Sequence, residues 1–536
     1  MKKLIPLLFL LSSCTFFINA IDNGSYDVVD VDGKGISVVY SGNINGETHP
    51  CGCRHFPLGG LPNVAAQMAE IQKTNEMVYV DAGDTFFPSS TLPSAMKDSL
   101  TFAAKNLATA LSKLGLKYFV PGDQDFAGGY EFLRDLLKNN KIKMLAANIS
   151  KKEYFDNKKW FVVKKGPHKI FITGLVERNV LPTQFRYLFT DETKALAETL
   201  KEMEDYGYKK DDPFSRLIIV SNAGIDPDKE LAKANPQIDW IIGAHSQSFT
   251  TSPFETGNTK LVQVLSRNHY LGEIKIDVTK DKKGDDYKMH EMRQEVGKKI
   301  DPNPWYEFID KHKETLSKIQ KEEQEKMTVI ADENARINTA ASCIDCHSAQ
   351  ADKWQTTAHS NAYATLVNAK EENNLNCIGC HSVGLNKKGG FKTAKEMLIF
   401  SDDQKEDKNK LLANYMTDLK KTFGKIPSIR KLDMAKQREL NKKWLAQDSK
   451  YKVTHNYMNV QCMNCHDKHV DHPFENHKME LTDAQKKEAM QDKCLSCHDP
   501  DQSPEWYSQG GKGNVDYAKL DEMMKKVACP KKVEEN

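Results

Sequence analysis

The sequence predicts two folded parts, an α/β domain followed by a mainly α-helical domain. Within residues 31–280, short runs rich in β-branched and aromatic residues alternate with helical stretches, as in an α/β fold. After residue 340, eight of the twelve cysteines fall into four C-x-x-C-H pentads. A chain of 536 residues is long enough for two or three domains, each with its own core.

The overall composition excludes some classes of protein. Hydrophobic residues make up 39% of the chain and charged residues 28%, which is typical of soluble globular proteins. No long apolar run follows the N-terminus, so the sequence predicts no membrane-spanning helix there. The formal net charge is only +2, and we therefore expect no nucleic-acid partner.

Residues 1–20 predict export from the cytoplasm. Two lysines precede an apolar stretch, residues 4–11, that is too short to span a bilayer. The segment Leu11-Ser12-Ser13-Cys14 resembles a bacterial lipobox, which implies cleavage before Cys14 and acylation of its thiol; the alternative is cleavage after Ala20. The predicted location is the periplasm of a Gram-negative bacterium, or its outer membrane with Cys14 as the point of lipid attachment.

Each pentad has the spacing needed for covalent haem attachment. Two thiols three positions apart reach the two vinyl groups of one haem, and the following imidazole lies under the iron as an axial ligand. A pair of zinc ribbons is the alternative, but zinc does not need a histidine after every C-x-x-C hook. The sequence therefore predicts four haem c groups, bound through Cys343, Cys346, Cys377, Cys380, Cys462, Cys465, Cys494 and Cys497, with proximal ligands His347, His381, His466 and His498.

The same region has more histidines than four proximal ligands require. A second histidine on an iron gives a low-spin electron carrier, whereas an open position permits substrate binding. The surplus favours an electron-transfer array that is mostly bis-histidine. The candidates for the distal position are His359, His455, His469, His472 and His477, of which His477 lies in a polar run typical of solvent-exposed residues.

The segments around the pentads resemble the cytochrome c-554 family of tetrahaem proteins, over roughly residues 336–530. The resemblance rests on the stretch from Trp354 to Leu366 and on the strings CIGCHSVGLNKKGGF, NVQCMNCHDKHVDHP and SPEWY. It implies that His359 is a distal ligand and that another ligand follows the third pentad. His472 has the right spacing for that second ligand, but the family's Gly-Pro-Gly turn is replaced by Asp467-Lys468-His469, so both His472 and His469 stay open.

A lysine-rich insert, residues 387–452, lies between the second and third pentads. Apolar residues at helical spacing predict an amphipathic helix over residues 408–423. This helix is either a solvated structural element or a docking surface for an acidic electron-transfer partner. The predicted partners are other cytochromes or a quinol-linked reductase.

In the N-terminal part, polar segments follow several predicted strands. Strands are expected at residues 36–40, 77–80, 118–120, 169–173, 217–220, 240–242 and 261–265, and the polar segments are residues 41–46, 81–84, 122–125, 221–224 and 243–247. Polar loops at the ends of strands are where α/β sheets build their sites.

This series resembles the calcineurin-like metallophosphatase fold of periplasmic 5'-nucleotidases over most of residues 35–280, with DAGDTF and IDWIIGAHS as the closest segments. The resemblance implies a sandwich with mixed sheets and a centre of two metal ions. Asp84 and His245 match the family's ligands. Other residues stand at the remaining positions, where the family has different side chains: Asn43, Asn45, Asp123, Gln124, Asn222 and Gln247.

These substitutions weigh against a hydrolytic centre. Carboxylate and imidazole ligands neutralise two metal ions and lower the pKa of bound water, whereas amides coordinate weakly and carry no charge. We therefore predict a phosphatase-like domain that is not hydrolytic. An active metal-dependent phosphatase or 5'-nucleotidase is the alternative.

The loop Pro50-Cys51-Gly52-Cys53-Arg54-His55 offers a different site at the same sheet end. Its thiols could cycle as a dithiol. They could also form a structural disulfide, with Cys529 as one candidate partner, because an exported protein oxidises spare thiols. In a third interpretation the loop completes a site for one transition metal, whose ligands would be Asp84, Asp123, His245, Cys51, Cys53 and His55.

The predicted order of parts is a signal peptide in residues 1–20, the phosphatase-like domain in 21–300, a connecting helix in 301–335 and the tetrahaem domain in 336–536. The leading interpretation is an exported multihaem c-type cytochrome that transfers electrons. An oxidoreductase that acts on a small substrate, at the Cys51/Cys53 loop or at an open haem, is the second interpretation. A third is a binding module whose phosphatase-like cleft captures an anion or nucleotide.

Overall fold

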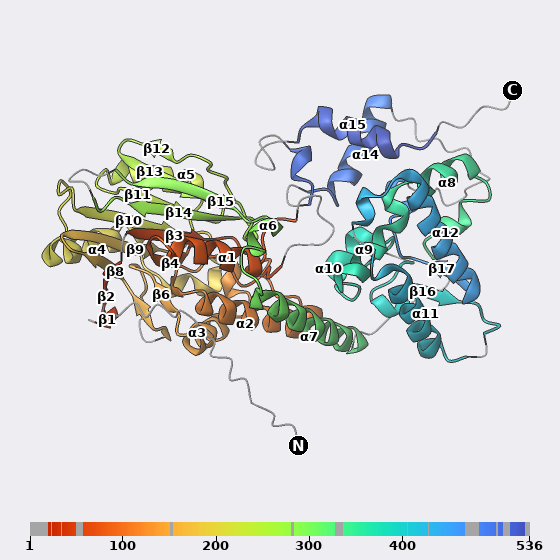
Figure 1. Cartoon of the computed structure of the whole chain (residues 1–536), viewed down its shortest axis with the longest axis horizontal. Helices are drawn as coiled ribbons and strands as arrows, with labels where there is room; N and C mark the ends of the chain where they lie inside the picture. The colour runs from red at the N-terminus through yellow and green to blue at the C-terminus, as the bar shows by residue number, and fades with distance from the viewer. Residues whose placement is uncertain are drawn as a thin grey trace, which may run out of the picture. The chain divides into compact units, whose positions relative to one another are not determined.

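The computed structural model divides the chain into two compact units (Figure 1). The first comprises residues 1–49, 58–92 and 100–305, and the second comprises residues 50–57, 93–99 and 306–536. The structure describes residues 20–22, 24–33, 35–49, 57–150, 154–279, 284–326, 336–387, 389–404, 406–426, 428–466, 482–499, 502–507 and 515–530. The predictions for Cys14, Cys51, Cys53, His55, His469, His472 and His477 lie outside these residues.

Two mixed β-sheets form the first unit, as the sequence predicts. The larger sheet has the order β1-β2-β8-β9-β10-β11-β13-β12, and the smaller has the order β15-β14-β3-β4-β5-β6-β7. The strands are β1 (Ala20–Asp22), β2 (Tyr26–Asp30), β3 (Ile36–Ser41), β4 (Glu76–Asp81), β5 (Leu116–Phe119), β6 (Lys143–Leu145), β7 (Asn157–Lys158), β8 (Trp160–Lys165), β9 (His168–Leu175), β10 (Ser215–Ser221), β11 (Trp240–Gly243), β12 (Phe254–Thr256), β13 (Thr259–Gln263), β14 (Tyr270–Ile276) and β15 (Asp286–Glu291).

Parallel strands with crossover helices build the centre of each sheet. Strands β3 to β6 are parallel neighbours, joined by α1 (Leu61–Gln72), α2 (Lys97–Lys113) and α3 (Tyr130–Asn139). In the larger sheet β9, β10 and β11 are parallel and are joined by α4 (Glu192–Tyr206) and α5 (Ile225–Ala234). Every residue of β3 and β10 is buried, as expected for parallel strands covered on both faces.

The two sheets pack against each other through large side chains. Tyr118 of β5 stacks on Phe161 of β8 with ring centroids 3.8 Å apart, and its hydroxyl donates to Asp27 of β2 at 2.8 Å. A sheet buries its apolar face only against another layer, so this contact fixes the first unit as a sandwich. The short helix α6 (Gln294–Gly297) follows the last strand.

The second unit is mainly helical, as predicted. Its helices are α7 (Pro304–Lys326), α8 (Ser348–Gln355), α9 (Ala362–Ala369), α10 (Leu375–His381), α11 (Lys408–Phe423), α12 (Met434–Lys450), α13 (Cys462–Cys465), α14 (Asp483–Leu495) and α15 (Tyr517–Val527). Its sheet consists of β16 (Leu398–Phe400) and β17 (Val453–Asn456), which run antiparallel. Among the described residues, no helix is both long enough and apolar enough to cross a bilayer.

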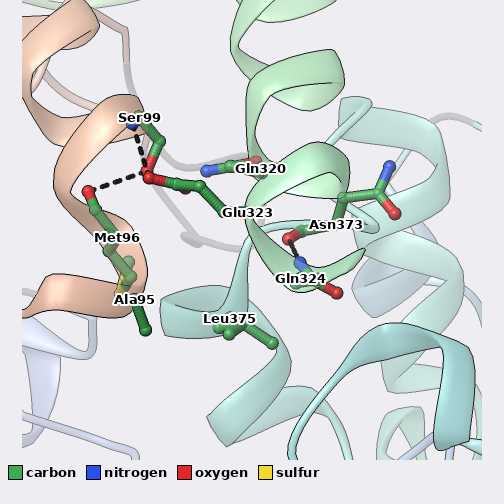
Figure 2. A pocket seen from close by; sticks show the side chains of 8 residues that line it. All are labelled: Ala95, Met96, Ser99, Gln320, Glu323, Gln324, Asn373 and Leu375. Atoms are coloured by element: carbon green, nitrogen blue, oxygen red, sulfur yellow. Dashed lines mark hydrogen bonds between the residues drawn. The ribbon is translucent and has the colours of Figure 1, made fainter. Parts of the chain in front are cut away.

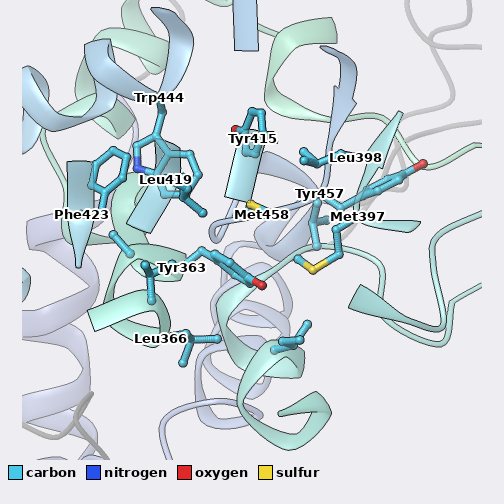
Figure 3. Close-up of a cluster of buried hydrophobic side chains, with 14 of the residues drawn as sticks. Tyr363, Leu366, Met397, Leu398, Tyr415, Leu419, Phe423, Trp444, Tyr457 and Met458 are labelled. Atoms are coloured by element: carbon cyan, nitrogen blue, oxygen red, sulfur yellow. The ribbon is translucent and has the colours of Figure 1, made fainter. Parts of the chain in front are cut away.

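The lysine-rich insert supplies much of the second unit's core (Figure 3). The predicted helix is α11, and its buried residues Leu411, Tyr415, Leu419 and Phe423 recur at every fourth position. Phe423 stacks on Trp444 of α12 with ring centroids 4.6 Å apart. These side chains lie in one cluster with Tyr363 and Leu366 of α9. Because the insert shares a core with α9, it is a structural part of this unit.

Helix α7 is held by hydrogen bonds to other segments of the second unit. Gln324 donates to the carbonyl of Asn373 at 2.7 Å and accepts from the backbone N–H of Ala394 at 2.8 Å. Glu323 accepts from the backbone N–H of Ser99 at 2.9 Å, and both residues line a small pocket (Figure 2). A carboxylate at this N–H fits the positive end of a helix, because Ser99 lies in the first turn of α2.

Candidate functional site

Each C-x-x-C-H pentad forms one turn of helix. The second pentad lies inside α10. In the other three, the backbone N–H of the histidine donates to the carbonyl of the first cysteine: His347 to Cys343 at 3.0 Å, His466 to Cys462 at 2.9 Å and His498 to Cys494 at 2.9 Å. Residues three apart in a helix lie on the same face, so this turn presents both thiols of a pentad on one side, as haem attachment requires.

The ring of His381 is oriented by hydrogen bonds at Nδ1, the nitrogen that does not bind the iron. Its Nδ1 lies 2.7 Å from the carbonyl oxygen of Ala362 and 3.0 Å from Oγ1 of Thr365. A carbonyl only accepts, so Nδ1 carries the proton and Nε2 keeps its lone pair. Burial also lowers the pKa of His381, which favours the neutral form that a metal binds. A hydrogen bond at the far nitrogen is typical of histidines that ligate metals.

The ring of His498 is held in a similar way and faces a second imidazole. Its Nδ1 lies 2.8 Å from Oγ of Ser503, and the ring stacks on Trp506 at 4.1 Å. The ring of His359, in the short helix η6 (Ala358–Asn361), lies 6.2 Å away, centroid to centroid. Two imidazoles bound at about 2.0 Å each to one ion place their ring centres roughly 6 Å apart. The separation of the pair thus matches that of two axial ligands on one haem iron.

The four pentads lie close to one another. The thiol of Cys380 is within hydrogen-bonding range of Cys497, which raises the pKa of Cys380 and lowers that of Cys497. The thiol of Cys462 is likewise within range of Cys343, and this contact raises the pKa of Cys462. The second pentad is thus a neighbour of the fourth, and the third is a neighbour of the first. The third also lies beside the fourth, because Nζ of Lys493 donates to the carbonyl of Cys465 at 3.2 Å.

The other candidate ligand in the described part of this unit is His455. It lies in β17 opposite Ile399, and its ring is 6.4 Å from that of Tyr457. Burial and nearby Arg336 lower its pKa. Its assignment as an axial ligand stays a prediction.

In the first unit, three of the predicted ligands meet at the ends of strands from both sheets. Asp84 follows β4, Asp123 follows β5 and His245 follows β11. Nδ1 of His245 lies 3.3 Å from Oδ2 of Asp84 and 3.3 Å from Oδ1 of Asp123, and one ligand atom from each residue lies within 4.8 Å of the others. The other three predicted ligands, Cys51, Cys53 and His55, are outside the described residues.

The electrostatics of this cluster favour a positive charge between the two carboxylates. Hydrogen bonds with Asp123 and Asp84 raise the pKa of His245 to about 10. Burial raises the pKa of Asp84, while the contact with His245 opposes that rise. A group of two carboxylates and one imidazole is also a donor set that suits one divalent transition metal.

The amide of Asn43 has partners at both ends, whereas Asn222 is bonded only through Nδ2 and its buried Oδ1 has no hydrogen-bond partner. Oδ1 of Asn43 accepts from the backbone N–H of His245 at 2.9 Å, and its Nδ2 donates to the carbonyl of Leu265 at 3.1 Å. Nδ2 of Asn222 donates to the carbonyl of Ala82 at 2.7 Å. The Asn43 amide thus serves as a brace between loops, and its oxygen has a partner other than a metal.

Several residues around the cluster have left-handed backbones. The φ angles are 53° at Asn43, 56° at Asn45, 55° at Asp84, 69° at His245 and 49° at Gln247. Such angles are uncommon outside glycine and gather at functional sites. The strand-end geometry of a binding site is therefore present even though its ligands differ from the family's.

Sequence reasoning missed Asp125, which organises this edge of the sheet. Its buried carboxylate accepts from four backbone N–H groups at 2.8–2.9 Å, those of Asp84, Thr85, Phe86 and Gly122. Desolvation raises its pKa well above the ordinary value. Its place in the polar segment 122–125 was the available signal, but nothing in the sequence distinguishes its role from that of Asp123.

Comparison with known proteins finds two separate similarities. Residues 342–404 match the family described as cytochrome c554 and c-prime. The chain is 36% identical to cytochrome c-554 of Nitrosomonas europaea over 64 residues, which are 9% of this chain and 27% of that protein. It is 24% identical to the 5'-nucleotidase of Bos taurus over 294 residues, or 48% of each chain.

Solved structures also align with half of the chain. The 5'-nucleotidase precursor of Thermus thermophilus covers 49% of this chain and 55% of its own, with 17% identity and a TM-score of 0.39. The calcineurin-like phosphoesterase YfkN of Bacillus subtilis covers 50% of this chain and 96% of its own, with 16% identity and a TM-score of 0.40.

These similarities define a fusion of two classes of domain. The chain joins a 5'-nucleotidase-like α/β domain to a region similar to cytochrome c554, and both resemblances predicted from the sequence are confirmed. The chain spans about half the length of the bovine 5'-nucleotidase and about a quarter of cytochrome c-554. Similarity to a cytochrome c family implies covalently bound haem and redox partners.

Proposed function

We propose that this protein is an exported multihaem c-type cytochrome whose second unit transfers electrons. The observation that carries the proposal is the facing pair His359 and His498, set at the spacing of two axial ligands on one iron. The four one-turn pentads support it, since each holds two thiols and a histidine in the arrangement that haem c requires. When bound, haem supplies one-electron redox chemistry.

In this proposal the chain holds four haem c groups. The four cysteine pairs bind the macrocycles, and His347, His381, His466 and His498 are the proximal ligands. His359 closes the sixth position above the fourth pentad, so that this haem exchanges electrons without binding substrate. Candidates for the other distal positions are His455 and, outside the described residues, His469 and His472.

The pairing of pentads supports electron exchange within the protein. Cys380 contacts Cys497 and Cys462 contacts Cys343, so the haems attached at these turns would be close neighbours. Electrons would then pass among the haems before leaving to a partner. The partner would be another cytochrome or a quinol-linked reductase.

The remaining assignments concern location and attachment. A C-x-x-C-H protein receives its haem outside the cytoplasm, which agrees with the signal peptide predicted in residues 1–20. Acylation of Cys14 would attach the mature protein to the outer membrane; cleavage after Ala20 would release it into the periplasm.

For the first unit we propose a single metal site in place of a hydrolytic pair. Asp84, Asp123 and His245 offer three converging ligand atoms, whereas Asn43 uses both ends of its amide elsewhere. A second metal ion would need charged ligands at the positions of Asn43, Asn45 and Gln247. These amide side chains carry no charge. Similarity to 5'-nucleotidases supports the alternative of metal-dependent phosphatase activity.

The test of the electron-transfer proposal is spectroscopic. The protein, expressed with a haem-attachment system, is expected to contain four covalent haems by the pyridine haemochrome assay. Its ferric spectrum is expected to be mainly low-spin, and reduction by dithionite and reoxidation should be reversible. A preparation that folds without covalent haem would contradict the proposal.

A separate assay tests the first unit. The metal content, measured apart from iron, is expected to be at most one divalent ion per chain, with no release of phosphate from nucleoside monophosphates when Mn²⁺ or Zn²⁺ is added. Metal-dependent nucleotidase activity that is lost in Asp84→Asn would overturn the non-hydrolytic assignment.

A further inference from the structure

We infer that helix α12 of the insert is a positioning element for the haem ligands, acting through Gln437 and Asn441 on the segment of residues 359–362. This inference rests on the proposed function, because it concerns how the ligand His359 is held. The sequence of α12 does not indicate this role, because it is typical of a polar helix in a lysine-rich insert.

Buried amides clamp the two residues that follow His359 to α12. Asn441 donates from Nδ2 to the carbonyl of Ser360 at 3.2 Å. Asn361 donates to the backbone carbonyl of Gln437 at 2.9 Å and to its Oε1 at 3.0 Å. Gln437 then donates to the carbonyl of Ile429 at 2.5 Å. The two residues that follow His359 are thus tied to α12 by directional bonds.

All four side chains of this clamp are nearly inaccessible to solvent. The exposed fractions are 0% for Ser360 and Asn361, 2% for Gln437 and 1% for Asn441. Water cannot replace a lost hydrogen bond at such positions, so each bond constrains the backbone more than a surface contact would. The same helix places Leu440 and Trp444 in the apolar core, which fixes its own position.

The other face of the segment is anchored near the third pentad. The carbonyl of His359 accepts from the backbone N–H of Val460 at 3.1 Å. Trp354 donates from Nε1 to the carbonyl of Val460 at 2.8 Å. The His359 turn is therefore held between α12 on one side and the chain before α13 on the other.

The segment of residues 359–362 also contacts a proximal ligand, His381. The carbonyl oxygen of Ala362, three residues after His359, accepts a hydrogen bond from Nδ1 of His381 at 2.7 Å. A hydrogen bond at this nitrogen makes a ligating imidazole more basic. A shift of the segment would therefore alter the distal ligand of the fourth haem and the proximal ligand of the second haem together.

Matched substitutions in the full haem-loaded chain separate positioning from general stability. Asn441→Leu and Asn361→Leu remove the donors on the two sides of the clamp. Gln447→Met is the control, because Gln447 is a buried amide of the same helix that donates to the carbonyl of Tyr415 at 2.9 Å and has no bond to the His359 turn. His359→Ala defines the signal of complete ligand loss.

We expect Asn441→Leu and Asn361→Leu to bind up to one more carbon monoxide per chain in the reduced state than the unaltered protein does. A high-spin ferric signal should appear, of the kind that His359→Ala produces in full. Gln447→Met should lower the melting temperature and leave spin state and carbon monoxide stoichiometry unchanged.

The inference is overturned if either clamp variant, with four haems attached, keeps the unaltered spin state and carbon monoxide stoichiometry. It is also overturned if Gln447→Met changes them as much as Asn441→Leu does. A different result, unchanged spectra in His359→Ala, would contradict His359 as a ligand and so the proposed function itself.

Discussion

The imidazole ring of His359 faces that of His498 at a centroid separation of 6.2 Å. The first residue lies in η6 and the second follows α14, so the pair brings together two segments of the second unit that are far apart in the sequence. An iron ligated by both would link these segments through two metal–nitrogen bonds. Haem attachment and the folding of this unit should therefore be coupled.

Replacement of His359 tests the pair directly. His359→Ala should convert one low-spin haem to high-spin and raise its midpoint potential, because loss of an imidazole destabilises the ferric state. Electron paramagnetic resonance and a spectroelectrochemical titration measure both effects. His290→Ala, at a buried histidine of the first unit, serves as the comparison, and an identical change in both variants would show that the alanine effect is not specific to the His498 pair.

Removal of the Ser503 hydroxyl should change the midpoint potential of the same haem without removing a ligand. Ser503 lies 2.8 Å from Nδ1 of His498, and an acceptor at this nitrogen raises the basicity of a ligating imidazole. Ser503→Ala should raise the midpoint potential of one haem while its low-spin spectrum persists. Thr417→Ala, which removes a hydroxyl on α11 that donates to the carbonyl of Ala413 at 2.8 Å, should leave all the potentials unaltered.

Asp125 should make a large contribution to the stability of the first unit. Asp125→Asn places an amide N–H where backbone donors converge, and an unpaired buried donor costs about 1–3 kcal/mol. We expect a lower denaturation midpoint for the first unit, monitored by far-ultraviolet circular dichroism. The exposed Asp226→Asn should change it little, and equal effects would refute the special role of Asp125.

The proposed metal site of the first unit is tested by replacing its ligands. His245→Ala and Asp84→Asn should each reduce binding of Co²⁺ or Zn²⁺ by at least about tenfold, because each removes a ligand of three. Isothermal titration with the metal alone measures the affinity. The buried Asp228, which lies outside this cluster, provides a matched Asp→Asn control. Retained affinity in both ligand variants would place any metal elsewhere.

Asp448 should make the stability of the second unit depend on pH. Burial raises its pKa to about 6, while Tyr415 donates to it at 2.6 Å and Asn456 at 2.9 Å. Between pH 4 and 6 the folded protein then holds a proton that the unfolded chain has released, so the free energy of unfolding falls as pH rises.

The size of this effect follows from the shift in pKa. The contribution amounts to roughly 1–3 kcal/mol, present below pH 4 and lost above pH 6. Asp448→Asn should flatten that part of the profile in urea unfolding measured at a series of pH values. Asp492→Asn, at a carboxylate on α14, should keep the slope; a profile unchanged by Asp448→Asn would assign the slope to other groups.

The sequence predicts those features that depend on local spacing. A C-x-x-C-H pentad is one helical turn wherever it occurs, so the four turns follow from the residues themselves. The meeting of Asp84 and Asp123 also follows, since each comes directly after a strand and the carboxyl ends of the parallel neighbours β4 and β5 share one sheet edge. His245 follows β11 of the other sheet, so its place beside them depends on the packing of the two sheets.

Features that depend on long-range packing could not be predicted in the same way. No local pattern shows that His359 faces His498, because many residues separate them. Gln437 and Asn441 resemble the solvated polar residues around them, and only the packing of α12 against the His359 turn buries them. The fourfold acceptor role of Asp125 likewise appears only when β4 and β5 lie side by side.

The stretch from His359 to Ala362 has a consequence for the rate of electron tunnelling. It joins the imidazole of His359 to the imidazole of His381 through the continuous backbone of residues 359–362 and one 2.7 Å hydrogen bond. Electronic coupling decays more slowly along bonds than across empty space. Exchange between the second and fourth haems would therefore have a through-bond route that stays open while the surrounding side chains fluctuate.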